Sequence, residues 1–175
     1  MTIKKKPRLT PEFAYIIGFW KKLRYSEGIG IKSTKEKVEH FINLIIKNQL
    51  TTPDKLIIKE NDTVAYFYHT KLRTFFEKVI NEQLDRFKYD NEYSANYFAG
   101  FFDAIGEYKF LKSKSNDEKL LIVISRSDSQ EEIMFARHNF KVKLRKGILY
   151  ILNGEEFTRK YNNYFKLQKI PLQEM

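Results

Sequence analysis

The sequence contains no cysteine, which excludes disulfide bonds, thiolate zinc sites and cysteine nucleophiles. Such a chain is typical of a reducing compartment, so we expect an intracellular, cytoplasmic protein, associated with the nucleoid if its source is prokaryotic. Histidine is also scarce, and His40, His69 and His138 show no spacing typical of metal ligands. No phosphate-binding loop, dinucleotide-binding fingerprint or Ser-His-Asp order is present, so these common types of active site find no support.

Long hydrophobic runs are absent as well. The longest, Phe13–Trp20, has eight residues, whereas a membrane-spanning helix needs ~18. The basic start of the chain, residues 1–9, is not followed by the hydrophobic region and cleavage site of a signal peptide. We therefore expect no membrane contact, and interpret residues 1–9 either as an arm that binds nucleic acid or as a frayed terminus.

Cations and aromatic residues are, in contrast, abundant. The 175 residues include 32 Lys and Arg against 22 Asp and Glu, which gives a formal net charge of +10, together with 15 Phe and 11 Tyr. A hydrophobic fraction of 42% is typical of a globular protein with a sizeable core. The excess of positive charge favours a polyanionic partner, most often nucleic acid, and the alternative is a charge that serves only solubility.

One order of elements occurs twice along the chain. We expect a first half at residues 10–90 and a second half at 91–175, after the basic arm at 1–9. The pattern predicts these elements for the first half: helix 11–24, strand 28–32, a helix capped by Ser33, hairpin 55–59 with 64–68, and a helix capped by Thr70. For the second half it predicts a helix capped by Ser94, strands 108–112 and 120–126, a helix from 128 or 129, hairpin 141–145 with 148–152, and helix 155–169.

Each hairpin alternates between an apolar face and a face of cations and aromatic residues. A turn centred on Asn61 and Asp62 places Lys59 opposite Val64, Ile57 opposite Tyr66 and Lys55 opposite Tyr68. Cations contact phosphates and guanine edges, and planar groups contact thymine methyls and sugars, so we predict that these faces bind double-stranded DNA; the alternative is an ordinary solvated face. The predicted DNA-binding residues are Lys55, Lys59, Tyr66, Tyr68, Lys109, Lys112, Arg126, Lys141, Lys143, Arg145 and Tyr150.

Two segments resemble the helix that names the LAGLIDADG homing endonucleases. Tyr97–Gly106 reads YFAGFFDAIG, and Ala14–Trp20, AYIIGFW, is a weaker copy. With the repeated element order, the resemblance covers residues 10–169. It implies an α+β fold in which two αββαββα halves form a pseudo-two-fold tandem, meet through Gly18 and Gly100, and lay their sheets in the major groove of DNA. The shorter spacing after Gly18 predicts that the first half lacks one hairpin strand.

The family also implies divalent metals, held by an acidic side chain five positions after each motif glycine. Leu23 and Ile105 stand there in this chain, and neither has an oxygen that could bind Mg²⁺. Glu27 and Glu107 are the only nearby acids that could substitute. Asp103 is expected to form an ion pair or a helix-end contact, with Lys22 as a candidate partner.

We therefore predict a degenerate, single-chain relative of these endonucleases that is a monomer and has kept binding to double-stranded DNA. With the catalytic acids lost, no metal and no other cofactor is expected, and the role would be regulatory or of a chromatin type. One alternative is an active, divergent endonuclease that uses Glu27 and Glu107 with Mg²⁺. The other is an RNA-binding splicing cofactor of the maturase kind.

Overall fold

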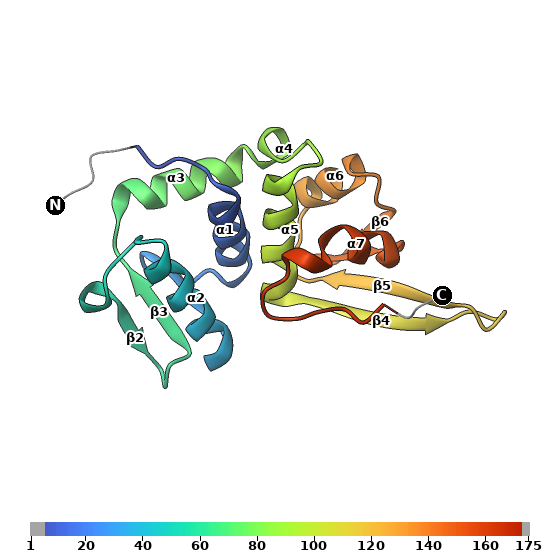
Figure 1. The fold of residues 1–175 in the computed structure, drawn as a ribbon, viewed down its shortest axis with the longest axis horizontal. Coiled ribbons are helices and arrows are strands. Elements are labelled where there is room, and N and C mark those ends of the chain that lie inside the picture. Colours follow the sequence, from blue (N-terminus) through green and yellow to red (C-terminus); the bar gives the residue numbers. More distant parts are fainter. Residues whose placement is uncertain (1–5, 173–175) are drawn as a thin grey trace.

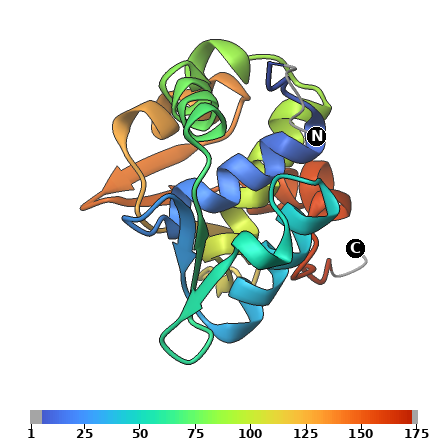
Figure 2. The same ribbon diagram turned by 90° about the vertical axis from the view of Figure 1, so that its left-hand side faces the viewer.

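Two long helices at the centre of the molecule separate two antiparallel sheets (Figure 1). The computed structural model describes residues 6–172, so residues 1–5 of the predicted basic arm lie outside the described residues. The central helices are α1 (Pro11–Leu23) and α5 (Glu92–Ile105), and α1 lies across α5 in the view of Figure 2. The other helical elements are α2 (Lys35–Lys47), η1 (Pro53–Lys55), α3 (Thr70–Asn81), α4 (Gln83–Arg86), α6 (Ser129–Arg137), α7 (Gly154–Tyr161) and η2 (Asn162–Tyr164).

The two sheets share one topology except for a single strand. The first sheet has the order β1-β3-β2, with β1 (Ile29–Lys32), β2 (Ile57–Lys59) and β3 (Val64–Phe67). The second has the order β4-β5-β7-β6, with β4 (Gly106–Lys112), β5 (Glu118–Ile124), β6 (Val142–Arg145) and β7 (Ile148–Ile151). Because β1 pairs with β3 as β5 pairs with β7, the element without a counterpart is β4.

A short remnant stands where the first half would have its copy of β4. Arg24 forms an isolated antiparallel bridge with Ile31, and the amide of Tyr25 donates to the carbonyl of Gly30 at 2.9 Å. The α+β fold with two repeated halves and one missing strand is thus confirmed, and the missing strand is an outer one.

Three predicted helix caps are wrong by one to three residues. The helix α1 is capped by Thr10, whose hydroxyl accepts from the Phe13 amide at 3.1 Å. The other helices are capped by Thr34 in place of Ser33, by His69 in place of Thr70, and by Asn91 in place of Ser94. Each capping residue has an extended backbone and a side chain that accepts a hydrogen bond directly before the helix. Several neighbouring polar residues could do the same, so the sequence alone did not single out the cap.

Two predicted elements are also shorter than expected. Lys55 belongs to η1, so its predicted pairing with Tyr68 does not form and β2 begins at Ile57. The last helix ends at Tyr161, not Lys169, because the chain turns back on itself beyond it. There the Asn162 side chain accepts from the Ile170 amide at 2.9 Å, and the turn buries Phe165 and Ile170.

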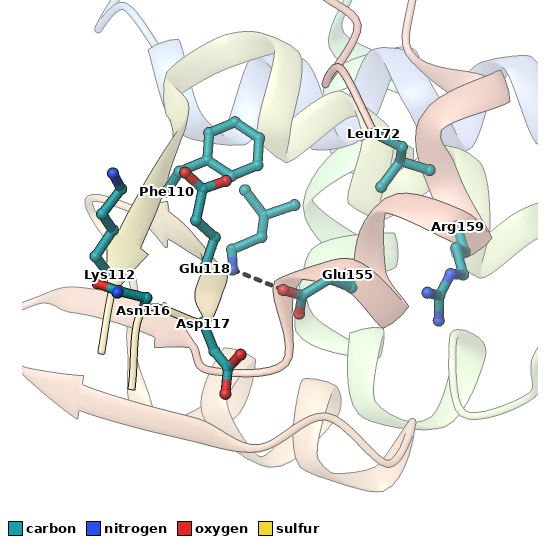
Figure 3. Close-up of a pocket in the computed structure, with 9 residues that line it drawn as sticks. Phe110, Lys112, Asn116, Asp117, Glu118, Glu155, Arg159 and Leu172 are labelled. Carbon is teal, nitrogen blue, oxygen red and sulfur yellow. Dashed lines mark hydrogen bonds between the residues drawn. The ribbon is translucent and has the colours of Figure 1, made fainter. Parts of the chain in front are cut away.

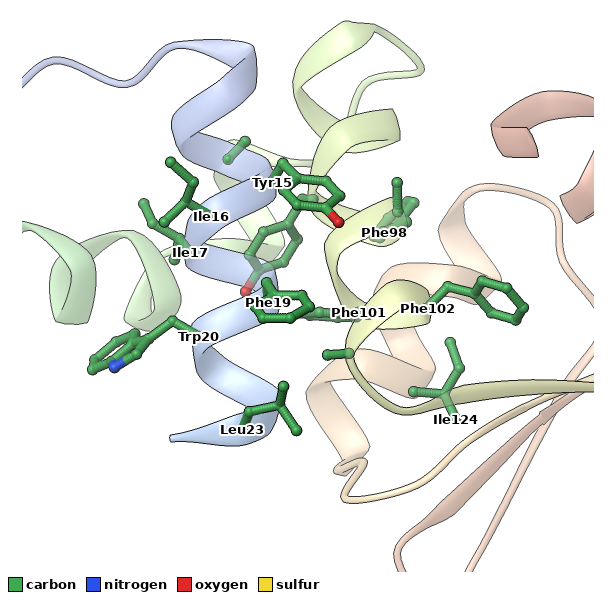
Figure 4. Close-up of a cluster of buried hydrophobic side chains, with 14 of the residues drawn as sticks. Tyr15, Ile16, Ile17, Phe19, Trp20, Leu23, Phe98, Phe101, Phe102 and Ile124 are labelled. Carbon is green, nitrogen blue, oxygen red and sulfur yellow. The ribbon is translucent and has the colours of Figure 1, made fainter. Parts of the chain in front are cut away.

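The core is continuous and built largely from aromatic rings. Figure 4 shows α1 and α5 side by side, with Tyr15, Phe19 and Phe101 among the buried side chains of the pair. Trp20 is fully buried against Phe76. Within residues 6–172, no helix is long and apolar enough to cross a membrane.

The crossing of α1 and α5 depends on two glycines. A Cβ added to Gly18 would collide with the backbone oxygen of Tyr97, and one added to Gly100 would collide with the oxygen of Tyr15 and lie 2.9 Å from the Phe19 nitrogen. The obstructing atoms belong to the backbone of the partner helix, which no rotamer change can move. Gly18 and Gly100 therefore set the distance between the two helices, as the sequence predicts.

Gly100→Ala should lower the free energy of unfolding by about 1–3 kcal/mol through overpacking. This direction is opposite to the gain of about 1 kcal/mol that alanine gives in an unobstructed helix. Gly18→Ala should act in the same direction. Urea unfolding measures both, with Ala136→Gly on the exposed side of α6 as the control, which should destabilise through helix propensity alone. A higher melting temperature in both alanine variants would contradict the close crossing.

Candidate nucleic-acid interface

The outer face of the second sheet carries half of the eight predicted cations: Lys109, Lys141, Lys143 and Arg145. The register pairs Lys143 with Tyr150, Tyr150 with Val123, and Val123 with Glu107, so one row of side chains crosses all four strands. Lys141 extends this face, since its carbonyl accepts from the Leu152 amide at 2.7 Å. On the other face, Val142, Leu144, Leu149 and Ile151 pack into the core, which confirms the predicted division of this hairpin.

The register also separates two lysines that the sequence analysis grouped together. Lys109 lies on the outer face opposite Leu121. Lys112 lies on the other face of the sheet together with Phe110, two residues earlier in the strand, and this face is turned to the core. Lys112 lines an open pocket of about 550 Å³ between the β4–β5 hairpin and α7 (Figure 3). Lys119, opposite Leu111, lies on the outer face and was missed because the predicted strand began two residues too late.

The outer face of the first sheet is a cluster of tyrosines. Tyr66 lies at its centre and is only 4% exposed, with the rings of Tyr25 and Tyr68 each 5.6 Å away and the Lys59 ammonium 5.2 Å above its ring. Tyr68 is 63% exposed and donates to the Glu27 carboxylate at 2.8 Å. The structure thus makes Tyr66 a support for its neighbours, and it adds Tyr25, which the alternation of the hairpin could not reveal.

Leu23 and Ile105 end the two central helices, as the motif spacing predicts. Neither side chain has a metal ligand, and the carbonyl one position earlier in each helix already accepts a hydrogen bond from a cation. Within the part of the chain that the structure describes, no three His, Cys, Asp or Glu side chains come together as a metal site. The residues at the helix ends therefore do not fit a bound divalent metal, and Mg²⁺ chemistry has no donor set there.

The two fallback acids occupy different settings. Glu27 lies in the loop between α1 and β1, where it accepts from Tyr68. Glu107 is the second residue of β4, exposed on the outer face opposite Val123.

A buried charge cluster connects the end of α1 to the second half. Lys21 and Lys22 both donate to the carboxylate of Glu131, which is fully buried at the start of α6. Lys21 also donates to the side chain of Gln83 at 3.1 Å, and Lys22 donates to the carbonyl of Arg126 at 3.0 Å. Lys22 is therefore not the partner of Asp103, as the sequence had suggested. It pairs with Glu131 of α6, which lies outside the two motif helices.

Asp103 fastens the C-terminal segment to α5. Its Oδ2 accepts from the hydroxyl of Tyr15 at 2.5 Å and from the amides of Lys166 and Leu167 at 2.7 and 3.3 Å. Burial raises the pKa of the Asp103 carboxyl, and these hydrogen bonds act in the opposite direction. Asp103 thus forms neither the ion pair nor the helix-end contact that the sequence suggested.

The overall fold is that of a known DNA endonuclease. No family model matches the sequence, and no curated protein matches it. A solved structure of mesophilic variants of the homing endonuclease I-DmoI is 18% identical, with a TM-score of 0.62, and the match covers 90% of this chain and 93% of that chain. I-DmoI in complex with DNA and Ca is 15% identical, with a TM-score of 0.60 and coverage of 90% and 93%. I-DmoI is a single-chain LAGLIDADG homing endonuclease, so the predicted fold is confirmed.

Stability should rise with pH above about 8 because of Lys22. Burial lowers the pKa of Lys22 from 10.5 to about 8, although Glu131 acts to raise it. Between about pH 8 and 10.5 the unfolded chain therefore binds more protons than the folded chain, and this group favours folding increasingly as pH rises. The full destabilising effect of the buried charge is present below pH 8.

Urea unfolding at pH 7.5 and 9.5 tests this effect in the parent and in Lys22→Met. The free energy of unfolding of the parent should rise relative to the variant by up to about 1.4 kcal/mol per pH unit within this window. Lys160→Met, which removes a half-buried lysine paired with Asp90, should retain the dependence of the parent. Equal pH dependence in the parent and in Lys22→Met would contradict the assignment.

Proposed function

We propose that this protein is a single-chain, monomeric binder of double-stranded DNA that no longer cleaves at the ends of its central helices. The observation that carries the proposal is the pair of outer sheet faces, each with cations and tyrosines and each backed by a buried apolar face. A role in regulation or in chromatin-type packaging follows from binding without cleavage. The fold of I-DmoI, which has been solved in complex with DNA, supports the choice of partner.

The cations on the outer face are available for phosphates. Within residues 6–172, no acid lies within 4.0 Å of the charged group of Lys109, Lys119, Lys143 or Arg145. Cations on the helices are arranged differently, as in the pairs of Arg86 with Glu82 and Lys160 with Asp90. A face of unpaired cations gains more from a polyanion than a face where acids already neutralise them.

The lack of carboxylate ligands at the helix ends supports the loss of cleavage. A divalent metal that activates water on DNA needs carboxylate oxygens beside the phosphate. Leu23 and Ile105 supply none, and the ammonium groups of Lys21 and Lys22 near one of these ends are paired with Glu131.

The experiment that tests the function is selection of bound fragments from a random duplex pool, with Mg²⁺ present and with cleavage followed in the same tubes. We expect recovery of intact duplexes. Recovery of cut duplexes would support the endonuclease alternative, and preferential displacement by structured RNA would support the maturase-like alternative.

Binding to duplex DNA should weaken steeply with salt, with a slope of about −0.9 for each neutralised phosphate and about five contacts or more. Replacing Lys141, Lys143 and Arg145 together by Gln should reduce the slope and the affinity while the melting temperature changes little, since surface substitutions shift stability by about 0.5 kcal/mol each or less.

The matched control for this variant removes three cations outside the outer faces: Lys78 of α3, Lys160 of α7 and Lys169 of the C-terminal segment. Fluorescence anisotropy with a labelled duplex compares the two triple variants. If both lose affinity equally, the partner responds to net charge alone, and the assignment of the outer face is wrong.

The parent protein should not nick a recovered duplex with Mg²⁺ or Mn²⁺. Should nicking appear, Glu27→Gln and Glu107→Gln identify whether these acids cause it, since each substitution removes a carboxylate and keeps the side-chain size. Loss of nicking in either variant would make the divergent endonuclease the better description of the protein.

A further inference from the structure

Two cations hold the ends of the central helices in equivalent ways. Arg126, in the loop before α6, donates from Nη1 to the carbonyl of Lys22 at 2.7 Å. Lys37, in the first turn of α2, donates from Nζ to the carbonyl of Ala104 at 2.6 Å. Lys22 lies four residues after Gly18, and Ala104 lies four residues after Gly100, so the accepting carbonyls occupy the same position in the two motif copies.

Both contacts cross between the two halves. Arg126 belongs to the second half and reaches the end of α1, whereas Lys37 belongs to the first half and reaches the end of α5. The chain thus places one cation at each helix end, although Lys37 lies within α2 and Arg126 lies before the cap of α6. Because the last turn of a helix carries partial negative charge, each cation is stabilised there without the help of an acid.

Neither cation is neutralised by a side chain. Among residues 6–172, no carboxylate lies within 4.0 Å of the Lys37 ammonium or the Arg126 guanidinium. Each has spare donors, because an ammonium carries three N–H groups and a guanidinium five. Arg126 is exposed and Lys37 is half-buried, so both remain accessible to a ligand from solvent.

The surroundings of these donors point to where the ligand would lie. The helix α5 continues directly into β4, and α1 continues into Arg24, which bridges to β1. The two helix ends therefore lie at the seam between the sheets, defined here by Leu23–Arg24 and Ile105–Gly106. A duplex that contacts both outer faces crosses this seam.

We propose that Lys37 and Arg126 bind two backbone phosphates of the duplex at the seam, one from each strand. This inference rests on the proposed function and names the chemistry of its central contact. The two strands of a duplex are antiparallel and related by a two-fold axis, and the two carbonyls that Lys37 and Arg126 contact occupy equivalent positions in the two motif copies. The helix ends lack the carboxylates that a divalent metal needs, but each has a cation that can bind a phosphodiester oxygen. That cation would contact the helix carbonyl and the DNA at the same time.

The test is a double variant, Lys37→Gln with Arg126→Gln. Glutamine removes the charge but retains an N–H group that can donate to the helix carbonyl, so the contact between the halves has a replacement. Binding of a duplex recovered by selection should show a salt slope reduced in magnitude by about 1.8, or about 0.9 for each phosphate. Lys37→Arg with Arg126→Lys keeps both charges and should retain most of the slope of the parent.

Lys169→Gln is the matched control. Lys169 is exposed and donates to the carbonyl of Asn162 at 2.7 Å, so the variant removes the same charge and the same kind of contact away from the seam. Its salt slope should equal that of the parent. An unchanged slope in the Lys37/Arg126 double variant, beside a reduced slope in the Lys141/Lys143/Arg145 variant, would overturn this inference and leave the proposed function intact. Salt-independent binding in the parent would overturn both.

A second measurement does not depend on the folding of any variant. Methylphosphonate groups, which carry no charge, replace the phosphates of the selected duplex one at a time, and the parent protein binds each duplex. Neutralisation near the centre of the site should weaken binding at one position in each strand. If no central position in either strand responds while flanking positions do, the phosphates are held by the sheets alone, and the seam contacts are wrong.

Discussion

The close backbone contact between α1 and α5 determines how the rest of the structure is arranged. At Gly18 and Gly100 a helix backbone touches the backbone of its partner, so the two helices cannot separate or rotate without losing the fit. Each helix then continues toward its own sheet, and the crossing fixes the position of the two outer faces relative to each other. The two sheet faces keep a fixed arrangement because this contact is rigid.

Around this symmetric contact the two halves have diverged. The first half has reduced its outer strand to the bridge of Arg24 with Ile31, and its outer face relies on clustered tyrosines. The second half retains four strands and presents a broader face with unpaired cations. The charge cluster of Lys21, Lys22 and Glu131 likewise crosses from α1 to α6, and the equivalent positions after Gly100 are Asp103 and Ala104, which make different contacts.

Patterns of two kinds in the sequence were sufficient for most of the fold. Strict alternation was sufficient for the register of the first hairpin, as in the pairs Lys59 with Val64 and Ile57 with Tyr66, because a shift by one residue would bury the cations. The motif glycines located the helix crossing. Contacts between distant segments left no such pattern, because the partner of Lys22 and the burial of Tyr66 depend on which segments meet in space. The helix caps were misplaced for a different reason: several polar residues before each helix were equally good candidates.

The helix ends show how a scaffold can keep its surface and change its chemistry. A carbonyl at the end of a helix attracts a cation, and a divalent metal or a basic side chain can satisfy it. A metal requires carboxylates as well, whereas Lys37 and Arg126 reach the carbonyls from the opposite half and also tie the halves together. With Leu23 and Ile105 in place of acids, repulsion between these cations and a dication would oppose metal binding further. The helix ends therefore carry the positive charge of Lys37 and Arg126 at the seam, where a duplex would meet it.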